Sequence, residues 1–255
     1  MRIENRLKER LRAGEKVVGV FVPMPSPEVV EILALAGFGY IMLDGEHGRV
    51  SPENAYPLIL AAEACGVPTV ARVGQNDRQV ILKYLDLGIG GVMIPQTNTL
   101  ATAQAALDAM RYHPRGVRGL AGGRHFDYGL GSPPAELVPQ LNDRVLAIVQ
   151  FEHIAALTEL DAILALPELD VLFVGPNDLA QSMGFPGQPD HPEVEAVIQQ
   201  VVAAGRNAGV AMGTVAADAT AVNKRIDQGF SMIGANAVSL LARGGRELLK
   251  AVTSA

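Results

Sequence analysis

Short, almost continuously apolar runs alternate with amphipathic segments along the whole chain. Eight of these runs are rich in Val, Ile, Leu and Met and lack the polar alternation of a half-exposed strand. Each is therefore interpreted as a strand buried on both faces of a parallel sheet. The predicted strands are Val17 to Val22, Tyr40 to Leu43, Thr69 to Val73, Gly91 to Ile94, Leu146 to Phe151, Val171 to Val174, Val210 to Gly213 and Met232 to Gly234.

Segments with a helical pattern lie between these strands. Ser26-Pro27 and Ser51-Pro52 each place a capping hydroxyl before a proline, which is typical of a helix start. Glycine follows several of the segments, where a left-handed residue can end a helix. Helices are predicted over Asn5 to Arg12 and Ala155 to Leu164, from starts near Ser26, Ser51, Gln75, Thr99, His191 and Ala216, and after Asn236, with ends at Gly37, Gly66, Gly88, Gly209 and Gly229.

The repetition of strand and helix predicts the fold class. Eight β-α units in about 250 residues fit a (β/α)8 TIM barrel, here preceded by an N-terminal helix. A doubly wound open sheet is the alternative, but the first βα turn lacks the glycine fingerprint of a dinucleotide-binding fold. No Pro/Ser-rich linker or low-complexity tract divides the chain, so residues 1–255 are predicted to form a single domain.

Charge and cysteine content narrow the function classes. The chain has 27 acidic and 21 basic residues, and the basic residues do not cluster, which disfavours nucleic acid or an anionic membrane as a partner. The N-terminal stretch is charged from its first residues, and no apolar run is long enough to span a membrane. A single cysteine, Cys65, excludes an internal disulfide, and the cytoplasm is the expected compartment.

Two neighbouring strands each deliver a carboxylate at their C-terminal end, where barrel enzymes carry their catalytic groups. Glu152 follows Leu146 to Phe151, and Asp178 follows Val171 to Val174. Because parallel neighbours lie about 4.8 Å apart, the two carboxylates should emerge side by side and require a positive charge between them. A hard divalent cation such as Mg²⁺ or Mn²⁺ would fit. Alternatively, both carboxylates are solvent-exposed helix caps.

His47 and Arg72 also follow predicted strands. His47 lies beside Asp44 and Glu46, which should favour its protonated form and raise its basicity; a structural histidine that caps a neighbouring helix is the alternative. Arg72 ends its strand, where the guanidinium could bind a substrate carboxylate or a developing oxyanion. The alternative for Arg72 is a structural ion pair with Asp44 or Glu46.

Two further features bear on the chemistry. The five lysines fall in helices or at the wrong end of a strand, so imine formation with a keto substrate is disfavoured and carbonyl activation is left to a metal. The longest irregular stretch, residues 112–134, mixes glycine with arginine. It is interpreted either as a segment that closes over an anionic substrate or as an oligomer contact.

Several motifs together resemble one enzyme family. They are, in chain order, Asp44-Gly45-Glu46-His47-Gly48, Ala71-Arg72-Val73, Leu85-Asp86-Leu87-Gly88 with Pro95, Arg115-Gly116-Val117-Arg118-Gly119, Gln150-Phe151-Glu152 and Gly175-Pro176-Asn177-Asp178-Leu179. Over nearly the whole chain, these motifs are similar to those of the HpcH/HpaI family of class II, metal-dependent pyruvate aldolases. The resemblance implies a (β/α)8 barrel that forms a homohexamer of two trimers and exchanges its last helix between subunits.

The resemblance implies roles for the residues that carry the chemistry. Glu152 and Asp178 would bind the divalent metal, which would be Mg²⁺, Mn²⁺ or Co²⁺. His47 would act as the base, and Arg72 would bind the substrate and stabilise the enolate transition state.

Further residues are assigned supporting roles by the same resemblance. Asp44 and Asp86 would orient His47, with Asp86 reaching the site of a neighbouring subunit. Gln150 and Asn177, with Asp178, would contact the keto acid.

The implied function is that of a carbon-carbon lyase. Such an enzyme makes and cleaves 4-hydroxy-2-oxo acids by the reversible addition of pyruvate or hydroxypyruvate to an aldehyde. The alternatives are a lyase of the citramalyl-CoA or malyl-CoA type, and a non-catalytic barrel that binds a keto acid.

Overall fold

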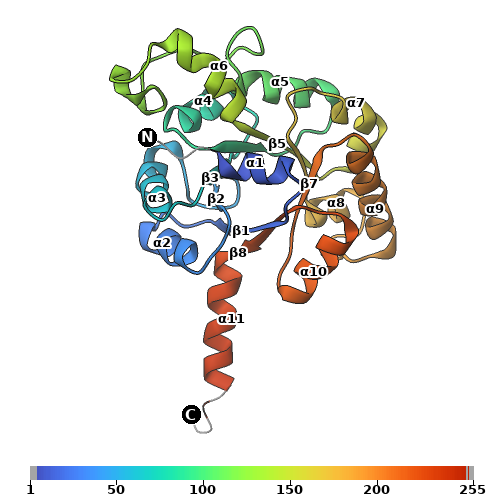
Figure 1. Ribbon diagram of the computed structural model, residues 1–255. Helices are drawn as coiled ribbons and strands as arrows, with labels where there is room; N and C mark the ends of the chain where they lie inside the picture. Colours follow the sequence, from blue (N-terminus) through green and yellow to red (C-terminus); the bar gives the residue numbers. More distant parts are fainter. Residues whose placement is uncertain (1–4, 251, 253–255) are drawn as a thin grey trace.

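The strands of the protein close into a barrel in the computed structural model, which describes residues 5–250 and residue 252 (Figure 1). Each strand pairs in parallel with the next, and β1 pairs with β8 to close the ring. The strands are β1 (Val17–Val22), β2 (Ile41–Asp44), β3 (Thr69–Arg72), β4 (Gly91–Ile94), β5 (Leu146–Phe151), β6 (Val171–Val174), β7 (Ala211–Val215) and β8 (Met232–Asn236). The predicted barrel is confirmed, and the strand ends differ from the predicted ones by two residues at most.

Most helices lie around the ring of strands. The helices of the described residues are α1 (Arg6–Arg12), α2 (Pro27–Leu35), α3 (Pro52–Ala64), α4 (Arg78–Asp86), α5 (Leu100–Met110), α6 (Pro134–Arg144), α7 (Leu160–Leu164), α8 (Pro176–Ser182), α9 (Pro192–Asn207), α10 (Ala219–Gln228) and α11 (Ala237–Lys250), with 3-10 segments η1 (Arg124–Gly129) and η2 (Ile154–Glu159). Helix α1, in contrast, packs its leucines against the inside of the barrel, and α11 points away from it (Figure 1). Ser26 caps α2 as predicted, since its hydroxyl accepts a hydrogen bond from the Val29 backbone N–H. The five glycines predicted to end helices all adopt left-handed φ angles, between 73° and 107°.

Three helical segments differ from the prediction. The helix predicted from Ala155 to Leu164 is divided into the 3-10 segment η2 and the short α7. The sequence prediction lacks α6 and α8. Pro139 lies inside α6, where a proline normally argues against a helix, and the 7 residues of α8 are too few to show a helical period.

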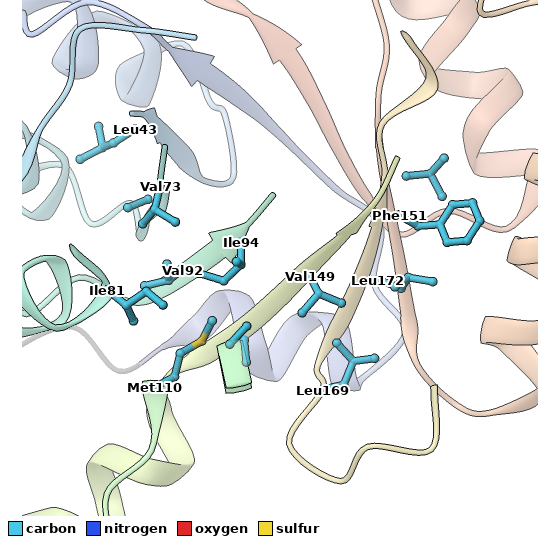
Figure 2. Packing of buried hydrophobic residues seen from close by; sticks show 14 of the residues in the cluster. Leu43, Val73, Ile81, Val92, Ile94, Met110, Val149, Phe151, Leu169 and Leu172 are labelled. Atoms are coloured by element: carbon cyan, nitrogen blue, oxygen red, sulfur yellow. The ribbon is translucent and has the colours of Figure 1, made fainter. Parts of the chain in front are cut away.

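Apolar side chains form one layer inside the barrel and another between the strands and the helices. Figure 2 shows the outer layer, in which Val92 of β4 and Val149 of β5 lie near Met110 of α5. Met93 and Ile148, the neighbours of these strand residues in the chain, belong to the inner layer. Successive residues of a strand therefore alternate between the two layers, as the pleat of a strand requires.

The last helix leaves the barrel. Figure 1 shows α11 continuing from β8 and pointing away from the other elements. Its side chains Leu241, Leu248 and Leu249 are between 62% and 70% exposed. Across the described residues, no helix has the combination of length and apolar character that crossing a membrane requires.

Candidate active site

The two-residue period of the strands brings predicted site residues into the mouth of the barrel. Val70 and Ile148 belong to the inner layer, and Arg72 and Gln150 follow two residues later on the same strands. Asp44, at the end of β2, is the register partner of Arg72 on β3. The three polar side chains therefore share the C-terminal end of the barrel interior.

Arg72 is held by two carboxylates. Its Nε and Nη2 donate to Asp44 Oδ1 and Oδ2 at 3.0 and 2.7 Å. Its Nη1 lies 3.2 Å from Glu46 Oε2, and its guanidinium carbon lies 4.9 Å from the centroid of the Phe21 ring. A guanidinium has five N–H bonds, so two of them remain for a ligand after these three contacts. The structural ion pair and the substrate-binding role, which the sequence leaves as alternatives, are therefore compatible.

His47 lies in the loop that follows β2. Asp44 Oδ1 accepts hydrogen bonds from the backbone N–H groups of Glu46 and His47, at 3.1 and 3.2 Å. The His47 ring is 64% exposed, and its Nε2 lies 3.9 Å from Glu46 Oε2. Asp44 thus positions His47 through the main chain, and the carboxylate beside the ring belongs to Glu46.

A glycine keeps this loop close to the barrel. A Cβ atom at Gly48 would lie 2.2 Å from the Asp44 carbonyl oxygen and 2.6 Å from the Pro23 Cα. The loop can therefore pass over the ends of β1 and β2 because residue 48 has no side chain.

Glu152 is buried, and both of its carboxylate oxygens accept hydrogen bonds. Oε1 accepts from the Gln96 backbone N–H and Oε2 accepts from Gln150 Nε2, each at 2.6 Å. Burial raises the pKa of Glu152 to about 7; the negative charges of Glu46 and Asp178 raise this pKa further, whereas the Gln96 amide and the charge of Arg72 lower it. Arg72 therefore does not offset the burial of Glu152 and the negative charges near it.

Asn177 and Asp178 are exposed in the first turn of α8. The negative charge of Asp178 acts on Glu46 and on Glu152, so these three carboxylates share one region. Burial raises the pKa of Glu46, the charge of Arg72 lowers it, and Asp178 is among the charges that raise it. Asp178 is solvent-exposed as the capping alternative predicts, but the N-cap of α8 is Gly175 and no side chain caps this helix; Glu152 is buried and bonded to a neighbouring turn and to Gln150.

The donor set of the mouth fits a hard divalent cation. Gln150 Oε1 is buried and accepts no hydrogen bond, and the buried Glu46 Oε2 has only its ion-pair contact with Arg72 Nη1. Carboxylate and amide oxygens are the ligands that Mg²⁺ and Mn²⁺ prefer. In the part of the chain that the structure describes, no three His, Cys, Asp or Glu side chains form a ready-made metal cage. The arrangement therefore suits a cation that is held by two carboxylates and keeps other positions for substrate and water.

Asp86 and the 112–134 segment lie at the opposite end of the barrel. Asp86 is the last residue of α4, just before the chain enters β4, and Arg118 Nη2 donates to it at 2.9 Å. Arg115 of the same segment binds Glu168, which precedes β6, at 2.6 Å. These contacts all lie at the N-terminal ends of strands. Neither Asp86 nor the segment therefore reaches the mouth of its own subunit.

Glu46 and Gln96 belong to the site but are absent from the predicted set of site residues. Both follow predicted strands; Glu46 also lies beside His47 and is one of the two ion-pair partners considered for Arg72, whereas position is the only signal for Gln96. The sequence does not indicate that Arg72 contacts Asp44 and Glu46 at once, or that Gln96 adopts a left-handed φ of 54°, with its N–H donating to Glu152.

Comparison with known proteins agrees with this geometry. Residues 17–240 match the family HpcH/HpaI aldolase/citrate lyase. The chain belongs to this family. A hydroxypyruvate/pyruvate aldolase of Sagittula stellata is 36% identical over 231 residues, which cover 90% of each chain. A 4-hydroxy-2-oxo-heptane-1,7-dioate aldolase of Salmonella dublin is 32% identical over 248 residues, 96% of this chain and 94% of the relative.

A solved structure supports the same assignment. The HpcH/HpaI aldolase/citrate lyase family protein of Burkholderia cenocepacia is 34% identical and superposes with a TM-score of 0.92, covering 98% of this chain and all of the other. The predicted family, its barrel fold and the prediction of an aldolase are confirmed.

Proposed function

We propose that this HpcH/HpaI family member is a metal-dependent aldolase that makes and cleaves 4-hydroxy-2-oxo acids. Its reaction would be the reversible addition of pyruvate or hydroxypyruvate to an aldehyde. The observation that carries the proposal is the meeting of His47, the clamped Arg72 and the carboxylates Glu152 and Asp178 at one mouth of the barrel. The names of the Sagittula and Salmonella relatives support this class of substrates.

Glu152 and Asp178 are the residues that would hold the cation, which would be Mg²⁺, Mn²⁺ or Co²⁺. When bound, such a cation supplies Lewis-acid catalysis, which lowers the barrier to losing a proton from C3 of the keto acid. The Glu152 carboxylate is already oriented for this role by its bonds to Gln96 and Gln150.

The other site residues would bind the keto acid and move the proton. Gln150 and Asn177 contact the carboxylate and keto end of pyruvate. His47, or a water that it activates, removes a proton from C3, and the two remaining N–H groups of Arg72 stabilise the negative charge that develops on the enolate oxygen.

Bond formation then completes the addition. C3 bonds to the carbonyl carbon of the aldehyde, and the aldehyde oxygen takes up a proton to become the 4-hydroxyl group. In the cleavage direction the 4-hydroxyl loses its proton, the bond between C3 and C4 breaks, and C3 regains a proton from the base.

The assembly that we propose is the homohexamer with an exchanged last helix. Its support is the row of exposed leucines on α11, which has no covering partner among the described residues (Figure 1). In such an assembly, Asp86 and the 112–134 segment would serve the mouth of a neighbouring subunit. The cytoplasmic location stays a prediction.

The decisive experiment follows the C3 protons of pyruvate in deuterium oxide. Chelator-treated protein is given Mg²⁺ or Mn²⁺, and deuteration of the methyl group is followed by NMR, or by mass spectrometry where Mn²⁺ broadens the signal. We expect exchange that requires the metal and is lost in His47→Ala. This result would establish enolate formation without knowledge of the aldehyde.

C3 exchange and a cleavage assay together separate the alternatives. A non-catalytic keto-acid-binding barrel would show no exchange with pyruvate or hydroxypyruvate under any metal. A lyase of the citramalyl-CoA or malyl-CoA type would act on the corresponding thioester, and not on a free 4-hydroxy-2-oxo acid. Cleavage of 4-hydroxy-2-oxo-heptane-1,7-dioate to pyruvate and an aldehyde is the outcome that we expect.

A further inference from the structure

The turn that follows β4, residues 95–99, is bonded to the end of β5 where Gln150 and Glu152 lie. The backbone ladder between β4 and β5 ends before these two residues. Beyond the ladder, the Gln96 N–H donates to Glu152 Oε1 at 2.6 Å, and Thr97 Oγ1 donates to the Gln150 carbonyl oxygen at 2.7 Å. The turn therefore extends the connection between the two strands into the active site.

The backbone of this turn is strained at Gln96. Its φ angle of 54° lies in the left-handed region, which is unfavourable for a residue with a Cβ atom. Strain of this kind persists where surrounding contacts hold it in place, and such sites are commonly functional. Here the unusual conformation is the one in which the Gln96 N–H meets a buried carboxylate.

Thr97 is tied to the same strand by a buried bond. Its side chain is 2% exposed, so water cannot replace the hydroxyl as the partner of the Gln150 carbonyl. Gln150 in turn donates from Nε2 to Glu152 Oε2. The turn thus reaches both oxygens of Glu152, one directly and the other through Gln150.

We propose that Gln96 and Thr97 are positioning residues, with the Gln96 backbone N–H fixing the Glu152 carboxylate for the cation and the Thr97 hydroxyl fixing Gln150 for the keto acid. This inference rests on the proposed function, in which Glu152 is a metal ligand. Each oxygen of Glu152 accepts one bond from the protein and keeps a lone pair for another ligand. Loss of the Gln96 bond would leave the Glu152 carboxylate free to rotate, and loss of the Thr97 bond would leave the main chain at Gln150 free to shift and to carry its side chain out of place.

Two substitutions at Gln96 separate the backbone from the side chain. Both Gln96→Gly and Gln96→Val remove the amide side chain and keep the N–H. Glycine adopts a left-handed φ without cost, so Mn²⁺ affinity should stay within about threefold of wild type. A β-branched residue disfavours that φ strongly, and Gln96→Val should weaken Mn²⁺ binding by about tenfold or more. The affinity is measured without substrate, from the electron paramagnetic resonance signal of free Mn²⁺.

A second pair tests Thr97. Thr97→Val removes the hydroxyl and should raise the pyruvate concentration for half-maximal C3 exchange by about tenfold, with a smaller change in the rate at saturation. Thr97→Ser keeps the hydroxyl and should restore wild-type behaviour. Thr158→Val is the matched control, because its exposed hydroxyl donates to the Ala155 carbonyl at 2.9 Å in η2 and has no bond to the site.

The outcomes distinguish this inference from the proposed function. If the wild-type protein binds no Mn²⁺ and shows no exchange, both proposals fail. If the wild type binds Mn²⁺ and exchanges protons while Gln96→Val and Thr97→Val behave like it, the positioning role alone is refuted. Equal losses in Gln96→Gly and Gln96→Val would assign the role to the side chain and overturn the backbone argument. Thermal melts verify folding, and the Thr97 pair decides the question if Gln96→Val does not fold.

Discussion

Replacing Asp44 with Asn removes the charge that holds both Arg72 and the His47 loop. Asp44 accepts hydrogen bonds from Arg72 Nε and Nη2 and from the backbone N–H groups of Glu46 and His47. An asparagine keeps only one oxygen, so its amide nitrogen must face at least one donor. The least costly orientation sets this nitrogen against Arg72 Nη2, where Asp44 Oδ2 now accepts at 2.7 Å.

The loss in free energy of unfolding follows from the burial of the Asp44–Arg72 ion pair. The side chains of Asp44 and Arg72 are 3% and 14% exposed. Removing one partner of a buried ion pair costs about 3–5 kcal/mol. Arg72 keeps its contact with Glu46, so we expect the lower end, about 3 kcal/mol. In a chain of this length, that loss lowers Tm by about 6–12 °C.

The assay combines thermal unfolding with C3 exchange of pyruvate. Asp44→Asn should melt lower and lose at least about tenfold in exchange rate, because the guanidinium and the loop are both displaced. Asp77→Asn is the matched control: Asp77 caps α4 by accepting from two backbone N–H groups, and asparagine caps equally well. If Asp44→Asn melts within about 2 °C of wild type, the ion pair of Asp44 with Arg72 does not stabilise the fold to the extent expected.

Three further predictions concern other parts of the molecule. Arg72→Lys should slow C3 exchange by orders of magnitude, since an ammonium cannot reproduce the planar fork, and a loss below about threefold would leave Arg72 with a structural role only. Bonding to Arg115 lowers the pKa of Glu168 from 4.5 to about 2, so its stabilisation is present above pH 4.5 and is lost as the pH falls toward 2; Glu168→Gln should cost up to about 3 kcal/mol at pH 7, with the difference from wild type vanishing in acid urea titrations. Leu249→Ser on α11 should shift the protein to smaller assemblies in light scattering, and an unchanged mass would contradict a subunit contact there.

The barrel is predictable from sequence because each strand is an uninterrupted apolar run with a helix signal behind it. Gly229 ends α10 with a φ of 107°, as its place in the pattern predicts. The pattern fails where a helix does not depend on a periodic apolar face. Pro139 inside α6 argues against a helix there, so α6 is not predicted. Helix α8, which carries Asp178, is too short to show a helical period.

The sequence predicts which residues lie in the site better than it predicts their contacts. Arg72 and Gln150 lie in the mouth because the strand period places them there, and the position of a residue along its strand can be read from sequence. The contacts between strands cannot be read in this way. The sequence leaves open whether Asp44 or Glu46 pairs with Arg72 and does not show that both do, nor that Asp86 binds Arg118 at the far end of the barrel.

The charge balance of the mouth leads to a last prediction. Asp44 and Glu46 contact the guanidinium of Arg72, and the negative charges of Glu46 and Asp178 both act on Glu152, so negative charge gathers at the mouth and costs stability unless a cation is bound. Asp178 is exposed and has no hydrogen bond or ion pair in the described structure, so Asp178→Asn should leave the metal-free protein at least as stable as wild type. The same change should abolish the stabilisation by Mn²⁺, which for wild type reaches about 3 kcal/mol at a hundredfold excess over Kd. Thermal melts in chelator and in Mn²⁺ measure both effects. A variant that melts at a lower temperature than wild type without metal, but is still stabilised by Mn²⁺, would show that Asp178 supports the fold and does not bind the cation.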